Sequence, residues 1–66
     1  MGTYRIYHVA SGGRLRLGET FQASSDGEAV MKARLLLVRG QSGELWEAGR
    51  IVGRFSDTHT FSPGGG

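Results

Sequence analysis

The fold is decided by residues 25–40, SDGEAVMKARLLLVRG, which carry the start and stop signals of one helix. Ser25 can accept a hydrogen bond from the free backbone N–H groups of the first turn. Glu28, three residues later, can reach back to the Ser25 N–H, so the two residues form a capping box. At the other end Gly40 can adopt the left-handed conformation that ends many helices. We therefore predict a helix over about residues 25–39.

This helix has two apolar faces. At about 100° per residue, one broad face suits packing on a sheet, and it consists of Ala29, Val30, Ala33, Leu36 and Leu37. A second apolar stripe, Met31, Leu35 and Val38, points well away from the first. A single helix on a single sheet needs one apolar face, so something else should cover the second stripe.

The chain on either side of the helix has the composition of β-strands. Aromatic and β-branched side chains fill residues 3–10, and apolar and polar side chains alternate over residues 14–23. After the helix, residues 44–47 and 50–55 are two short strands joined by a two-residue turn. The pattern predicts an α+β fold of order ββαββ, with one four-stranded, mainly antiparallel sheet and the helix packed on one face.

The alternation predicts which strand residues share a face. In the second strand one face carries Leu15, Leu17, Phe21 and Ala23, and the other carries Arg14, Arg16, Thr20 and Gln22. Gly18 beside Glu19 suggests a bulge or bend in this strand.

The two-residue turn of the second hairpin, Ala48-Gly49, sets a register between its strands. The register pairs Glu47 with Arg50, Trp46 with Ile51, and Leu45 with Val52. One face carries Trp46, Ile51 and Phe55. We expect this Trp46 face to point inward, because it would bury the larger apolar area.

The short chain limits the core. Sixty-six residues form one domain, which we place at residues 1–56, followed by a flexible tail at residues 57–66. Small scaffolds usually add disulfides, a metal or a partner chain, and the sequence has no cysteine. A partner chain is the remaining source of stability. Alternatively, the segment around Phe61 folds back over the second helix stripe.

The charge pattern weakens a nucleic-acid function without excluding it. The net charge is +2, and seven of the eight basic residues are arginines that are scattered along the chain. No apolar stretch approaches the roughly 20 residues that span a bilayer, and residues 1–9 do not resemble a signal peptide. We expect a cytoplasmic protein that does not act at a membrane.

Three segments together resemble a set of small bacterial hypothetical proteins, described as domains of unknown function. These segments are Tyr4-Arg5-Ile6-Tyr7, Ser25-Asp26-Gly27-Glu28-Ala29 and Trp46-Glu47-Ala48-Gly49-Arg50-Ile51-Val52-Gly53-Arg54. The resemblance covers most of residues 3–55. It implies a ββαββ order and a bacterial or phage origin, and it implies no catalytic residue and no ligand.

The sequence contains no motif for catalysis or for a cofactor. No hydroxyl residue lies in a nucleophile motif. His8 stands alone in a strand, and Asp57 with His59 lies in the predicted tail, where rigid positioning is absent. The histidines and carboxylates fall at no metal-ligand spacing. We expect a protein that is not an enzyme and that has no cofactor or metal.

Protein association is the function that the pattern favours. Exposed apolar patches usually mark interaction sites, so we predict an interface made by Met31, Arg34, Leu35 and Val38. The partner would be a second copy, in a homodimer, or a larger protein. The alternative is a nucleic-acid-binding sheet that uses Arg5, Tyr7, Arg14 and Arg16, where arginines alternate with an aromatic ring.

Overall fold

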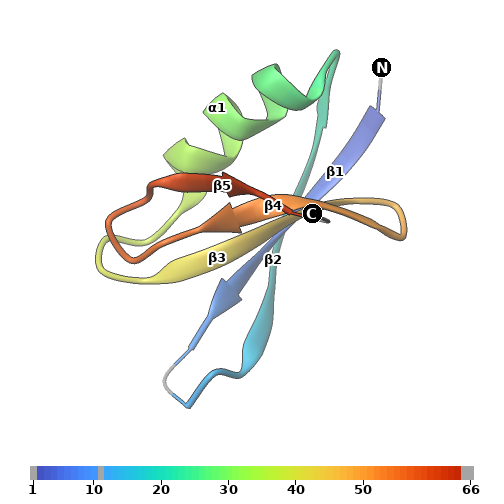
Figure 1. The fold of residues 1–66 in the computed structure, drawn as a ribbon. Helices are drawn as coiled ribbons and strands as arrows, with labels where there is room; N and C mark the ends of the chain where they lie inside the picture. The colour runs from blue at the N-terminus through green and yellow to red at the C-terminus, as the bar shows by residue number, and fades with distance from the viewer. Residues whose placement is uncertain (1, 11, 65–66) are drawn as a thin grey trace.

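One antiparallel sheet and one helix make up the protein in its described part, which a computed structural model gives as residues 2–10 and 12–64 (Figure 1). In chain order the elements are β1 (Gly2–Val9), β2 (Leu15–Ala23), α1 (Asp26–Leu36), β3 (Ser42–Glu47), β4 (Arg50–Phe55) and β5 (Phe61–Pro63). The predicted α+β class is confirmed.

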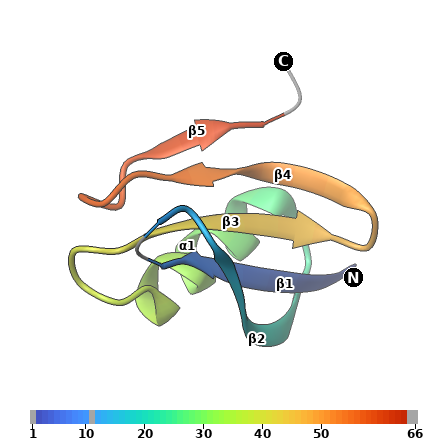
Figure 2. The same ribbon diagram turned by 90° about the horizontal axis from the view of Figure 1, so that it is seen from below.

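The strands lie side by side in the order β2-β1-β3-β4-β5, and every neighbouring pair is antiparallel. The chain first makes the β1–β2 hairpin and then crosses over β1 through α1. It continues as the meander β3–β4–β5. Figure 2 shows α1 behind β1 and β3, so the sheet face toward the viewer is not covered by the helix.

The predicted number of four strands is wrong, because Phe61–Pro63 adds a fifth at the edge of β4. Phe61 pairs with Phe55, and the two ring centroids are 5.1 Å apart. Phe61 covers one side of the core residue Phe55. This contact explains why Phe61–Pro63 joins the sheet although its sequence lacks strand character. β5 lies within the predicted flexible tail, of which residues 65–66 fall outside the described part of the chain.

The helix begins as predicted but ends earlier. The Ser25 hydroxyl oxygen accepts a hydrogen bond from the Glu28 N–H at 3.2 Å. The Glu28 carboxylate, however, accepts from the N–H of Ser24 at 3.0 Å, so the reciprocal half of the box is displaced by one residue. The helix ends at Leu36 because Leu37 is extended, at φ −73° and ψ 143°. The left-handed Gly40 therefore lies in the loop beyond the helix.

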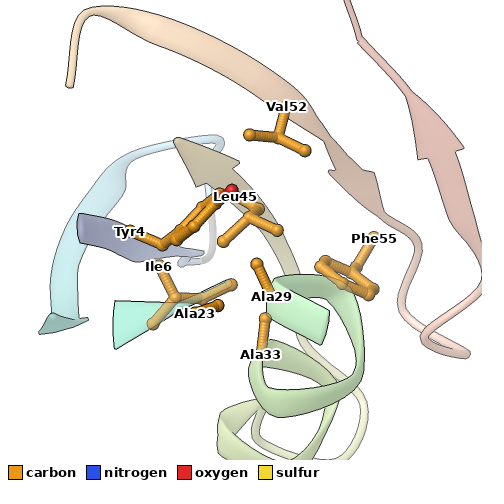
Figure 3. Close-up of a cluster of buried hydrophobic side chains, with 8 residues drawn as sticks. All are labelled: Tyr4, Ile6, Ala23, Ala29, Ala33, Leu45, Val52 and Phe55. Carbon is orange, nitrogen blue, oxygen red and sulfur yellow. The ribbon is translucent and has the colours of Figure 1, made fainter. Parts of the chain in front are cut away.

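The core lies between α1 and the sheet (Figure 3). The helix contributes Ala29 and Ala33, both fully buried, as its apolar pattern predicts. These small side chains let the helix lie close to the strands, where Ile6 and Leu45 are also fully buried. The eight buried residues are Tyr4, Ile6, Ala23, Ala29, Ala33, Leu45, Val52 and Phe55.

The expectation that Trp46 points into the core is wrong. Trp46 does pair with Ile51 as predicted, but Leu45 pairs with Gly53, so Val52 is an extra residue in a bulge. The bulge turns Phe55 to the same face as Leu45, against the helix. The larger apolar area of Trp46 does not decide which face is buried, because the helix presents alanines to the sheet and Leu45 packs beneath them.

The bulge predicted in β2 is present, and it moves the side chains before and after it to opposite sides of the sheet. Leu17 pairs with Tyr7 and Thr20 pairs with Arg5, so two residues of β2 lie opposite the single residue Ile6. Phe21 and Ala23 pack against the core, whereas Leu15 and Leu17 are 50% and 67% exposed. The predicted common face of these four side chains is therefore wrong.

Candidate functional site

The surface of α1 that points away from the sheet carries the most exposed large apolar side chain of the described residues. Leu35 is 86% exposed and Met31 is 68% exposed. At 100° per residue, Glu28 shares this side of the helix with them, about 20° from Leu35, and Gly27 and Arg34 lie at its edge, about 80–100° from Leu35. We call these five residues the outer helix face.

Charged side chains surround the apolar centre of the outer helix face. Lys32 forms an ion pair with Glu28 at 3.3 Å and donates a hydrogen bond to the Gln22 carbonyl at 2.8 Å. The backbone N–H of Ser24, together with Lys32, holds the pKa of the Glu28 carboxyl below its usual value. Arg34 makes no ion pair within the described residues. Its guanidinium lies 5.9 Å from the centroid of the Phe55 ring.

Three of the four predicted interface residues, Met31, Arg34 and Leu35, line one open hollow of about 640 Å³. Val38 is separate from them, because the helix ends before it. It is 52% exposed, and its carbonyl lies 3.0 Å from the His59 ring Nε2. The alternative that the segment around Phe61 covers the stripe is not what the structure shows, because Phe61 packs on Phe55 and leaves Leu35 exposed.

The uncovered side of the sheet carries an aromatic pair on its two adjacent strands β1 and β3. The Tyr7 and Trp46 rings are 6.4 Å apart and nearly perpendicular, at 81°. The Trp46 indole N–H donates to Glu44 at 3.0 Å, and Glu44 also pairs with Arg54 at 3.6 Å.

Arg5 lies beside this aromatic pair, directly opposite Trp46 on one side and Thr20 on the other. Residues directly opposite in neighbouring strands share a face. We call Arg5, Tyr7, Thr20 and Trp46 the open sheet face. Together they line a hollow of about 350 Å³.

The four residues of the predicted nucleic-acid site do not come together. Arg5 and Tyr7 lie on the open sheet face. Arg16 pairs with His8, one position along from Tyr7, and therefore lies on the opposite side of the sheet. There it lines a hollow with Val38. Arg14 precedes β2, where its carbonyl accepts a hydrogen bond from Ala10 at 2.7 Å.

Trp46 and Thr20 are the residues of the open sheet face that sequence reasoning missed. The strand alternation gave the needed signal, because it places Trp46 and Leu45 on opposite faces. The bulge at Val52, which reverses the position of Phe55 relative to Trp46, is not visible in the alternation.

A buried phenol and three charged groups form a polar cluster where α1 begins. The Tyr4 hydroxyl donates to Asp26 at 2.7 Å, and Arg50 donates to Asp26 at 3.1 Å and to Glu47. The bond to Asp26 and burial raise the pKa of Tyr4 to about 12, and Arg50 with Tyr4 lowers the pKa of Asp26. Each side chain is held by another member, so the cluster ties α1 to β1 and to the β3–β4 turn.

A buried histidine nitrogen is a further polar feature of the described residues. The Nδ1 atom of His8 is buried and has no hydrogen-bond partner among the described residues. No group of three histidine, aspartate or glutamate side chains in that part of the chain could hold a metal ion. Within the same residues, no helix is long and apolar enough to cross a membrane. No protein-family model, curated protein or solved structure matches the chain.

Proposed function

We propose that the protein is a non-enzymatic interaction module that forms a homodimer through the outer helix face. The observation that supports this proposal is that Leu35, which lines an open hollow on the helix together with Met31, is 86% exposed. Solvent-exposed apolar side chains that cluster on one element usually mark an interaction site. A chain of 66 residues also has a small core, so a second copy adds needed stability.

The apolar centre of the outer helix face can pack on itself when two copies meet about a two-fold axis. If the helices run antiparallel and the axis passes between Met31 and Leu35, each Met31 lies over the partner's Leu35. A two-fold contact repeats this pair twice, so four apolar side chains come together. Arg34 and Glu28 lie on opposite sides of Met31 around the helix, so each remains at its own edge of the contact.

The first test is the solution mass by light scattering over a series of protein concentrations. We expect a wild-type dimer and a monomeric Leu35→Glu variant, since the glutamate would place a charge in the apolar centre. Leu17→Glu is the matched control, because Leu17 is also exposed but lies on the sheet. A wild-type monomer at every concentration, or a Leu35→Glu variant that remains dimeric, would overturn the proposed interface.

A further inference from the structure

We propose that the open sheet face binds single-stranded nucleic acid, with one base against the Tyr7–Trp46 pair and one phosphate on Arg5. This function is independent of the proposed homodimer, because α1 and the open sheet face lie on opposite sides of the sheet (Figure 2). Its residues differ from those that the sequence predicted, because Trp46 and Thr20 replace Arg14 and Arg16.

The aromatic pair has the geometry of a base-binding corner. Two rings 6.4 Å apart at 81° form perpendicular walls, so a flat base that stacks on one ring meets the other with its edge. Bases stack on aromatic side chains of a sheet in this way when the strand is single and its bases are unstacked. Both rings belong to strands inside the sheet, β1 and β3, which hold them in place. The Glu44 carboxylate further fixes the indole through its hydrogen bond of 3.0 Å.

The hollow beside the two rings is large enough for a ligand and contains polar groups that fit a nucleotide. Its volume of about 350 Å³ lies at the lower end of the range, about 300–1,000 Å³, that ligand sites occupy. The Thr20 side chain, directly opposite Arg5, adds a hydroxyl group that can donate to a phosphate or a base.

The charges on the open sheet face predict that the affinity for single-stranded nucleic acid depends only weakly on salt concentration. Arg5 is exposed and makes no ion pair within the described residues, so its guanidinium is available to a phosphate. Arg54 is already paired with Glu44. One phosphate contact corresponds to a slope of roughly −0.7 in a plot of log affinity against log salt concentration for a single strand. Stacking therefore contributes much of the binding, and salt weakens it modestly.

The fluorescence of Trp46 provides the measurement, because it is the only tryptophan in the chain. A short single-stranded oligoadenylate should quench it in a saturable manner, and adenosine monophosphate should bind more weakly. Tyr7→Ala should reduce the oligonucleotide affinity at least about fivefold, as expected for the loss of a stacking ring. No saturable quenching by the oligonucleotide would overturn the proposal. Equal affinity for the mononucleotide would also overturn it, because the site would then bind free nucleotides.

Two arginine variants separate this site from general attraction to a basic protein. Arg5→Gln should weaken binding and flatten the salt dependence. Arg16→Gln removes the same charge from the other side of the sheet and should leave the affinity unchanged. Both residues are exposed, so both variants should fold. Equal losses in the two variants would overturn the proposal. Leu35→Glu should bind like the wild type, so failure of the dimer and failure of this site give different results.

Discussion

At the residue scale, the polar cluster of Tyr4, Asp26, Glu47 and Arg50 joins parts of the chain that are more than 20 residues apart. Tyr4 is 3% exposed, so its hydroxyl requires a partner, and Asp26 in the first turn of α1 provides it. Asp26 thus has two roles, since it also places a negative charge at the helix start, where the dipole favours it. The sequence indicates the second role and not the first.

Tyr4 predicts a loss of stability in alkali. Because its pKa in the folded protein is about 12, above the usual value of 10.0, folding favours the protonated phenol. The stabilisation is therefore complete below about pH 10 and is lost as the pH rises toward about 12. Denaturant unfolding at a series of pH values should show this decline in the wild type and a smaller decline in Tyr4→Phe.

Tyr7→Phe is the control for this experiment, because Tyr7 lies on the other side of the sheet from Asp26. It should keep the alkaline decline of the wild type. Equal alkaline declines in the wild type and in Tyr4→Phe would show that the Tyr4–Asp26 bond does not cause the effect.

At the element scale, β5 depends on a single glycine of β4. A Cβ atom on Gly53 would lie 2.6 Å from the Ser62 carbonyl oxygen and would overlap the Phe61 ring. Phe61 could then no longer pack on Phe55. The bulge beside Gly53 and the absence of its side chain together make room for the fifth strand.

Gly53→Ala should destabilise the protein by about 1–3 kcal/mol, as overpacking usually does. Hydrogen exchange should accelerate at the Gly64 N–H, which donates to the Val52 carbonyl at 3.0 Å. Gly49→Ala is the matched control, because nothing lies within 4 Å of its added Cβ, and it should unfold like the wild type. Retained exchange protection at Gly64 in Gly53→Ala would contradict this account of β5.

At the scale of the whole molecule, a single helix on a five-stranded sheet leaves two large surfaces without a covering layer. The outer helix face and the open sheet face lie back to back, so a homodimer through the helices would leave both open sheet faces accessible. The two proposed functions are therefore compatible in one assembly.

The proposed homodimer predicts that the melting temperature rises with protein concentration. Each tenfold increase in protein concentration stabilises the dimer by about 1.4 kcal/mol, which is about 0.7 kcal/mol for each of its two chains. For a domain of this size the rise is about 3–6 °C per tenfold increase in concentration. Calorimetry of the wild type should show this shift, and Leu35→Glu should melt at one temperature throughout. A wild-type melting temperature that does not depend on concentration would contradict dimerisation.

The sequence by itself determined the features that depend on neighbouring residues. Residues 26–36 form a helix because Ser25 caps its first turn and because Ala29 and Ala33 recur on one side. The turn between β3 and β4 also follows from the sequence, with Glu47 opposite Arg50. The exposure of Met31 and Leu35 was predictable for the same reason, since their helical positions point away from the core.

Only the tertiary structure decided the features that depend on contacts between distant segments. The bulge at Val52 placed Phe55 on the core side with Leu45, whereas Trp46 lies beside Tyr7 on the other side, because an extra residue in one strand reverses the faces beyond it. β5 forms because the Phe61 ring packs on Phe55, and because Gly53 has no side chain that would overlap this ring. Local patterns specify which elements form, whereas packing between elements selects which faces become core and which remain available for binding.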